Sequence, residues 1–253
     1  MKNKFKISII MPNYNSYDNI GQTIKSISNQ SFKDWELIIV DDNSNAKTIE
    51  LLKNIKKRYK KKIRIYFLKR NKGDGYCRVF GCKKSKSKLI AFIDSDDIWA
   101  KHKLRLQFNF MKKNNFHFTY TNYTPFKDKN TYFKEIHPPK QLSFTSFIKN
   151  SSIATSSMMV SKKLLRDIKL SKSPNFEDFF LKCQLLKKVK YANCVNKNLL
   201  KYRLRKNSLS KNKFRNIFWL WKINRKFNKL DFSTSLISLI FISYNSLKKY
   251  GLK

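Results

Sequence analysis

The stretch Leu37-Ile38-Ile39-Val40-Asp41-Asp42-Asn43-Ser44 places two acids directly after an apolar run, and Leu89-Ile90-Ala91-Phe92-Ile93-Asp94-Ser95-Asp96-Asp97 repeats the arrangement further along the chain. Apolar runs of this length predict buried strands of one parallel sheet. The carboxyl ends of such strands meet at one edge of the sheet, where open α/β folds bind their ligands. The two clusters therefore predict a bound cation or a specific hydrogen-bonding ligand at that edge.

The rest of the first hundred residues alternates strands and helices. An apolar run over residues 7–11 precedes a helical apolar face over residues 20–27, and a second helical pattern covers residues 49–59. A strand is predicted over residues 63–68 and a helix within residues 74–85. Four strands joined by helices predict a mainly parallel, Rossmann-like α/β sheet with right-handed connections.

The second half is patterned less regularly. A helix is predicted from residue 101, and residues 116–140, which are polar, aromatic and contain three prolines, predict loops that shape a site. A strand is predicted around residues 156–160. A helix is predicted over residues 176–188, beginning with a Glu-Asp pair. No internal repeat is present.

The last forty or so residues differ in kind. Residues 211–229 carry basic and aromatic side chains and no acids, whereas residues 232–247 are apolar but interrupted by serines. The second segment is too short and too polar for a membrane span of about 20 residues. Both segments predict amphipathic helices, which either lie on a membrane or a partner or pack back on the domain as its closing helices.

The composition is strongly basic, with 56 Lys and Arg against 16 Asp and Glu in 253 residues. The net charge of +40 suits nucleic acid and equally suits the anionic face of a membrane. A coding bias toward lysine is a third explanation, so charge alone does not choose. The four cysteines match no zinc-site spacing and follow no secretory signal, which indicates reduced, packing cysteines in a cytoplasmic protein.

Four short motifs occur in one order: Met11-Pro12-Asn13-Tyr14-Asn15, Val40-Asp41-Asp42-Asn43-Ser44, Asn71-Lys72-Gly73 with Arg78, and Ala91-Phe92-Ile93-Asp94-Ser95-Asp96-Asp97-Ile98-Trp99. Together they resemble the family 2 glycosyltransferases of the A-type fold, over about residues 6–210. Residues 202–210 and Trp219-Leu220-Trp221 are most similar to bacterial enzymes that build surface polysaccharides, including the teichuronic-acid type.

The resemblance implies an A-type catalytic domain over residues 1–210. Residues 1–100 would form its nucleotide-binding half and residues 101–210 its acceptor-side half. Residues 211–253 would form a basic, aromatic helical extension with a possible membrane association. Neither a G-x-G-x-x-G after the first strand nor a phosphate-binding G-x-x-x-x-G-K-[ST] is present, which argues against a dehydrogenase or a P-loop enzyme.

The resemblance also assigns the donor contacts. Pro12 and Tyr14 would form the wall against which the base stacks, and Asp42 would accept a hydrogen bond from the base edge. Arg78 would contact the donor or order the acidic cluster, although Val79 stands where the family often has Asn. An alternative for the first cluster is that its acids cap the helix near residue 46, and for Asp41 this alternative is as strong as a functional role.

The second cluster suits a metal ion. Loss of a nucleoside diphosphate requires its developing negative charge to be neutralised, and oxygen ligands on a turn achieve this by holding Mg²⁺ or Mn²⁺. By resemblance, Asp96 and Asp97 share the metal and ribose contacts and Asp94 supports them. Which of the three ligates the metal directly stays open. The alternative is an acidic turn that caps the helix near His102.

Transfer by single displacement also needs a base for the acceptor hydroxyl. Asp178, in the late acidic pair of the family, is the predicted base, and an ordinary first-turn acid stabilised by the helix dipole is the alternative. Arg203 and Arg205 are predicted to close over the donor phosphates, with a solvated basic loop as the alternative. Many family members carry His at the position of Arg205, which weakens the transfer of that role.

The sequence thus predicts an inverting, metal-dependent glycosyltransferase that moves a sugar, UDP-linked in our interpretation, to a hydroxyl of a lipid-linked cell-surface glycan intermediate. We expect it in the cytoplasm, peripheral on the inner face of the membrane through an anionic lipid surface, with no nucleic-acid partner. A nucleic-acid-binding protein is the competing class, and it leaves Asp42, Asp96, Asp97 and Asp178 unexplained. A catalytically inactive glycosyltransferase-like scaffold is a third alternative.

Overall fold

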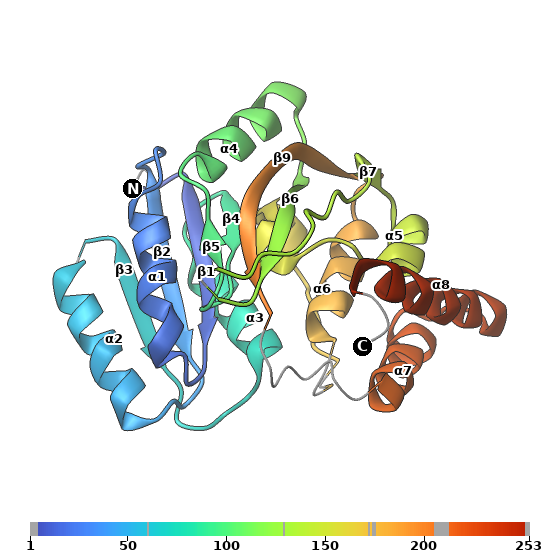
Figure 1. Cartoon of the computed structure of the whole chain (residues 1–253), viewed down its shortest axis with the longest axis horizontal. Helices are drawn as coiled ribbons and strands as arrows, with labels where there is room; N and C mark the ends of the chain where they lie inside the picture. The colour runs from blue at the N-terminus through green and yellow to red at the C-terminus, as the bar shows by residue number, and fades with distance from the viewer. Residues whose placement is uncertain are drawn as a thin grey trace.

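The computed structural model describes residues 5–59, 61–128, 130–171, 173, 176–204 and 213–250. Its described residues form one mixed sheet in the order β3-β2-β1-β4-β8-β6-β9-β5, with β7 paired to β9, and helices lie on both faces (Figure 1). The first four strands, β1 (Ile7–Asn13), β2 (Trp35–Asp41), β3 (Ile63–Phe67) and β4 (Leu89–Phe92), are parallel. The predicted α/β fold, with its parallel Rossmann-like portion, is confirmed.

Three crossover helices cover the two faces of this parallel portion. Helices α1 (Tyr17–Ser28) and α2 (Ala46–Arg58) share a core with Ile9 and Leu37, whereas α3 (Asp74–Lys84) shares the opposite core with Ile10 and Ile38. Successive residues of a strand point to opposite faces, so a strand buried on both faces is apolar at most of its positions. This is why the apolar runs of the sequence predicted these strands correctly.

The second half extends the sheet with strands of mixed direction. Strand β8 (Met159–Ser161) pairs antiparallel with β4 and with β6 (Phe118–Phe126), and β6 runs parallel to β9 (Ala192–Arg203). The short strands β5 (Ile98–Trp99) and β7 (Gln141–Leu142) both pair with β9. The remaining elements are α4 (Lys103–Asn114), α5 (Phe144–Asn150), α6 (Glu177–Leu186) and the 3₁₀ turns η1 (Thr155–Ser157) and η2 (Lys162–Leu165).

Strand β6 corrects the prediction of loops over residues 116–140, which is wrong in its first part. Thr119 and Thr121 are fully buried within the sheet. Thr119 Oγ1 accepts a hydrogen bond from Gln107 Nε2 at 3.0 Å, so a polar side chain is accommodated there. The strand predicted around residues 156–160 begins later than expected, because a 3₁₀ turn occupies residues 155–157.

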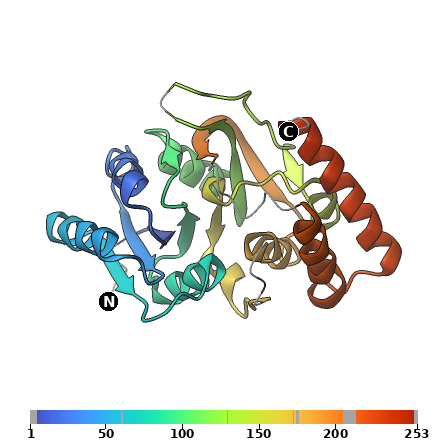
Figure 2. The same ribbon diagram turned by 60° about the horizontal axis from the view of Figure 1, so that its bottom comes forward.

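The C-terminal helices pack on the domain. Helix α7 (Lys213–Lys222), the π-helical turn η4 (Ile223–Phe227) and α8 (Phe232–Tyr250) lie together beside α5 and α6 at one end of the molecule (Figures 1 and 2). Leu220 and Ile223 are buried in the core, and Ser238 Oγ donates to the Ile148 carbonyl at 2.6 Å. One face of these helices therefore closes the domain, as the second sequence alternative expected.

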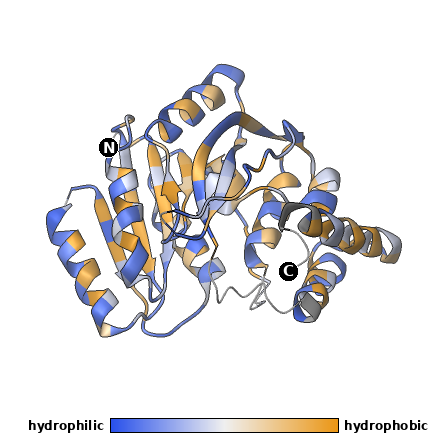
Figure 3. Cartoon of the chain, in the orientation of Figure 1, coloured by the Kyte–Doolittle hydropathy of each residue, from blue (hydrophilic) through white to orange (hydrophobic). Residues whose placement is uncertain are grey.

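The other face of the same helices is apolar and exposed, and α8 carries much of the hydrophobic colour of Figure 3 at that end. Its large exposed side chains are Ile217, Phe218, Phe232, Leu236, Ile237, Ile240, Phe241, Tyr244 and Leu247. Among the described residues, we find no helix with the length and apolarity needed to cross a bilayer.

Candidate active site

Asp41 joins the loops that follow β1 and β2. Its Oδ1 accepts hydrogen bonds from Asn13 Nδ2 and Ser44 Oγ, both at 2.6 Å, and its Oδ2 accepts from Ser44 N at 3.1 Å. The residue is fully buried. The alternative that an acid of this cluster caps α2 is wrong, because Asn45 is the cap and accepts from Thr48 N at 3.0 Å. Asp41 thus holds two loops of the edge together.

Asp42 lies beside it and holds the turn before α3. Its two carboxylate oxygens accept hydrogen bonds from Lys72 N at 2.7 Å and Gly73 N at 2.8 Å. Gly73 has a φ of +85°, a conformation that glycine adopts without strain. Nearby, Pro12 is buried in β1 and Tyr14 is 46% exposed in the loop after it. The donor-base roles of Pro12, Tyr14 and Asp42 stay predictions.

The acidic turn of residues 94–97 is held from two sides by arginines. Arg78 Nη2 on α3 donates to Asp94 Oδ1 at 2.7 Å. At the end of β9, Arg203 N donates to Asp97 Oδ1 at 2.8 Å and Arg203 Nε donates to the Asp96 carbonyl at 2.9 Å. Sequence reasoning missed this use of Arg203, for which it proposed phosphate contacts. Arg205 lies outside the described residues.

Asp97 is a buried carboxyl group in an unfavourable electrostatic environment. Burial, followed by the charges of Asp96 and Asp94, raises the pKa of Asp97 well above its usual value, while Ser156 and the backbone of Arg203 oppose the rise. Its Oδ2 is buried and makes no hydrogen bond of normal geometry within the described part of the chain. A cation at this turn would relieve both the repulsion and the missing contact.

The turn suits Mg²⁺ or Mn²⁺ held jointly with a bound diphosphate. Magnesium commonly takes one or two protein carboxylates and completes its coordination with substrate phosphates and water. Asp96 and Asp97 can supply those carboxylates. Within the described ranges, no group of three or more His, Cys, Asp and Glu side chains is arranged to hold a metal ion. The metal role of Asp96 and Asp97 stays a prediction.

Arg78 connects the acidic turn to the second half of the site. It is buried between Asp94 and Asp74, whose Oδ2 lies 3.7 Å from Arg78 Nη2. Burial alone would lower the pKa of Arg78, but the charges of Asp94, Asp74 and Asp178 outweigh it and raise the pKa. The sequence left two roles for Arg78: contact with the donor, or ordering of the acidic cluster. Its ion pair with Asp94 corresponds to the second role.

Asp178 is ionised at the start of α6. Its Oδ2 accepts from Lys182 Nζ at 2.7 Å and from Thr155 Oγ1 at 3.3 Å, and its side chain is 40% exposed. Burial would raise the pKa of Asp178, but Lys182 and Arg78 prevail and lower it to about 2. Sequence reasoning also missed Lys182, although a cation four residues after an acid on a helix is a readable signal.

The neighbouring Glu177 stabilises the segment that precedes α6. Its carboxylate accepts hydrogen bonds from Ser171 Oγ at 2.7 Å and Ser173 N at 3.0 Å. A Cβ added to Gly75 would lie 2.6 Å from Glu177 Cβ, so glycine at that position lets α3 approach α6 closely. This approach brings Arg78 toward Asp178.

The sheet, with its acidic carboxyl edge, has the fold of the A-type glycosyltransferases. Solved structures of that fold superpose on it, among them residues 1–349 of Staphylococcus aureus TarS in complex with UDP-GlcNAc, with a TM-score of 0.74, 18% identity and coverage of 96% of this chain and 73% of that one. The mannosyltransferase PcManGT from Pyrobaculum calidifontis, in complex with GDP-Man and Mn²⁺, gives a TM-score of 0.71 at 11% identity and covers 100% of this chain and 77% of that one. At such identities the likeness shows the fold alone.

Sequence comparison gives the family. The model described as glycosyl transferase family 2 matches residues 8–169, and the chain belongs to that family. It is 32% identical over 244 residues to TuaG of Bacillus subtilis, named for teichuronic acid biosynthesis, with 96% of each chain covered. It is 32% identical over 222 residues to Escherichia coli WfgD, a UDP-Glc:α-D-GlcNAc-diphosphoundecaprenol β-1,3-glucosyltransferase, covering 87% of this chain and 85% of WfgD. The family resemblance seen in the sequence is confirmed.

Proposed function

We propose that this protein transfers a sugar from a UDP-linked donor to a hydroxyl of a lipid-linked intermediate in cell-surface polysaccharide synthesis, with inversion at the anomeric carbon. Support comes from the names and near full-length similarity of TuaG and WfgD. The observation that carries the proposal is the position of Arg78, which donates a hydrogen bond to Asp94 of the acidic turn and interacts electrostatically with the carboxylate of Asp178.

In this proposal the donor lies along the carboxyl edge of the sheet. Tyr14 and the Pro12 backbone face the base, and Asp42 recognises its edge. Asp96 and Asp97 hold Mg²⁺ or Mn²⁺, which when bound supplies positive charge against the departing diphosphate. Asp94 is kept in place by Arg78, and Arg203 fixes the turn through its contacts to Asp96 and Asp97.

Asp178 acts as the base toward the acceptor. As the acceptor oxygen bonds to the anomeric carbon, the bond from that carbon to the diphosphate breaks and the hydroxyl proton passes to Asp178. Attack on the face opposite the leaving group inverts the configuration. The low pKa of Asp178 keeps it ionised at neutral pH. It also makes the carboxylate a weak base, which is sufficient because the attacking hydroxyl becomes strongly acidic as its new bond forms.

The C-terminal helices would dock this site on the membrane. Their exposed apolar face includes Phe218, Phe232 and Phe241, and basic residues such as Arg225 and Lys226 are exposed on η4. Apolar insertion together with attraction of about 1 kcal/mol per cation near an anionic surface supports peripheral attachment on the cytoplasmic face.

The test is a thermal-shift screen of nucleotide sugars with and without Mn²⁺, followed by transfer assays. We expect a Mn²⁺-dependent rise in Tm with UDP or a UDP-sugar, its loss in Asp97→Ala, and normal binding without transfer in Asp178→Asn. Transfer at the normal rate by Asp178→Asn would refute the base assignment. Salt-sensitive binding of nucleic acid with no nucleotide effect would refute the enzyme and favour a nucleic-acid binder.

A further inference from the structure

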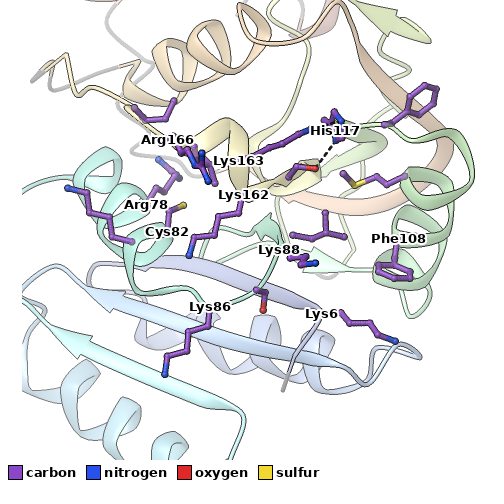
Figure 4. A pocket seen from close by; sticks show the side chains of 18 of the residues that line it. Lys6, Arg78, Cys82, Lys86, Lys88, Phe108, His117, Lys162, Lys163 and Arg166 are labelled. Atoms are coloured by element: carbon purple, nitrogen blue, oxygen red, sulfur yellow. Dashed lines mark hydrogen bonds between the residues drawn. The ribbon is translucent and has the colours of Figure 1, made fainter. Parts of the chain in front are cut away.

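A large hollow lies away from the carboxyl edge of the sheet. It has a volume of about 1390 Å³ and lies between α3, the start of β4, the end of α4 and η2. Figure 4 shows its basic side chains set around the space, with Arg78 and Arg166 on one side and Lys6 on the other. We call this hollow the basic groove.

The charged residues that line the basic groove are almost all positive. Nine of its residues are Lys or Arg, and Asp167 is its one acid. Lys83, Lys88 and Lys112 are exposed and have no ion pair with any described residue. Concentrated positive charge in a concavity attracts anions more strongly than the same charge on a flat surface. The groove is therefore suited to a ligand with several negative groups.

Some of these cations are fixed in place by the fold. Lys162 Nζ donates to the Ser85 carbonyl, and Lys163 Nζ lies 2.8 Å from His117 Nε2. His117 Nδ1 in turn lies 3.1 Å from Ser161 Oγ. Phe108, Met111 and Leu165 add apolar surface between the charged groups. A mixed lining of this kind suits rings that carry charged substituents better than isolated small anions.

The groove adjoins the proposed acceptor side of the active site, with which it shares part of its lining. A small crevice beside Asp178 is lined by Arg78, Val79, Ile168 and Leu181, and the same four residues line the basic groove. From Arg78 the groove follows α3 toward its end at Lys84, roughly 9 Å at 1.5 Å per residue, and continues past Lys88. A chain whose end reaches Asp178 can therefore extend into the groove.

The geometry points to the basic groove as a binding site for an anionic glycan chain, the part of the acceptor beyond its reacting sugar, which carries carboxylate or phosphate groups. This inference rests on the proposed function, since it places the acceptor hydroxyl at Asp178. The lining shared with the crevice beside Asp178 favours such a chain over a bilayer surface or a nucleic acid, neither of which has to reach the reacting group.

The test measures binding of a fluorescently labelled oligogalacturonide to the full chain by anisotropy, with a maltooligosaccharide of equal length as the neutral probe. The double variant Lys88→Glu/Lys112→Glu changes two exposed lysines of the lining, one directly before β4 and one near the end of α4. Lys53→Glu/Lys57→Glu changes charge equally on the exposed surface of α2 and is the matched control. We expect the groove variant to bind roughly tenfold more weakly, about 1.4 kcal/mol, and the control to stay close to wild type.

Several outcomes would overturn the inference: equal weakening in both double variants, unchanged binding in the groove variant, or equal affinity of wild type for the neutral probe. Groove-dependent binding of a single-stranded oligonucleotide or of phosphatidylglycerol vesicles, without oligogalacturonide binding, would also overturn it. If charge reversal unfolds the chain, Lys88→Gln/Lys112→Gln replaces it. UDP binding with Mn²⁺ is measured on the same samples: its absence in wild type refutes the proposed function, whereas UDP binding without oligogalacturonide binding refutes the groove alone.

Discussion

Gly81 lies where α3 meets the sheet, and one added methyl group tests how closely the two pack. A Cβ at Gly81 would lie 2.7 Å from Ile10 Cγ2 and 3.4 Å from Val40 Cγ2. Both neighbours are fully buried in strands that are paired on both sides. Optimal carbon contacts are about 3.5–4.0 Å long, so Gly81→Ala forces a shift of the helix or of Ile10.

The magnitude follows from two opposing effects. Alanine is favoured over glycine within a helix by about 1 kcal/mol. Overpacking a core costs about 1–3 kcal/mol, and the contact at Gly81 belongs to the upper part of that range because Ile10 has a stiff, β-branched side chain. We therefore expect Gly81→Ala to lose about 1–2 kcal/mol of unfolding free energy, and each kcal/mol lowers Tm by about 2–4 °C in a chain of this size.

Gly21 provides the matched control. It lies in α1, is exposed, and has no atom within 4 Å of an added Cβ. Gly21→Ala should gain up to about 1 kcal/mol from helix propensity alone. Guanidinium chloride unfolding of both variants and wild type measures the two changes. If Gly81→Ala were as stabilising as Gly21→Ala, the close contact of α3 with β1 would be refuted.

Three further variants test the site. Lys182→Met removes the cation that holds the pKa of Asp178 near 2, so the acid limb of the pH profile of kcat/KM should move to higher pH. If that limb did not move, Asp178 would not be the titrating base. The same variant should lose stability that wild type has above pH 3.8 and loses as pH falls toward 2, about 1 kcal/mol after solvent screening of the partly exposed carboxylate, measured by denaturant unfolding across that range. Asp97 has a raised pKa when folded, so its ionisation destabilises the fold at neutral pH, and Asp97→Asn should raise the Tm of the ligand-free protein by the equivalent of about 1 kcal/mol while abolishing the Mn²⁺-dependent shift with UDP. Arg78→Met leaves Asp94 and Asp74 without their shared cation and should cost about 2–3 kcal/mol, less than a fully buried pair because Asp94 is 28% exposed; wild-type stability by chemical denaturation would contradict this role.

The parallel half of the fold was predictable because its strands are buried on both faces. Strand β2 is apolar at consecutive positions over residues 37–40, a pattern that few other structures produce. Strand β6 was not predictable in the same way, since its threonines appear polar in sequence and only their hydrogen bonds in the folded core make them suitable. Propensity is local, whereas the acceptability of a buried hydroxyl depends on residues distant in the chain.

The residues of the candidate site likewise fall into those that local sequence could place and those that depend on distant parts of the chain. The acids that follow β2 and β4 could be placed at one edge because strand direction alone fixes where they end. The contacts of Arg203 could not, because they depend on a strand that returns 106 residues after Asp97. The ion pair of Asp178 with Lys182 lies between these cases, since the spacing within one helix was visible but the burial of the lysine was not.

The hydrogen bonds from Arg203 to the acidic turn limit which segments can be exchanged in a chimera of this protein and a relative. The turn lies within the first hundred residues of the sequence, yet Asp97 Oδ1 and the Asp96 carbonyl accept hydrogen bonds from Arg203, the last residue of β9. A chimera that exchanged residues 1–100 alone would combine the turn of one chain with the end of β9 from another. We therefore expect the turn to keep its shape in such a chimera only when the end of β9 is exchanged together with it.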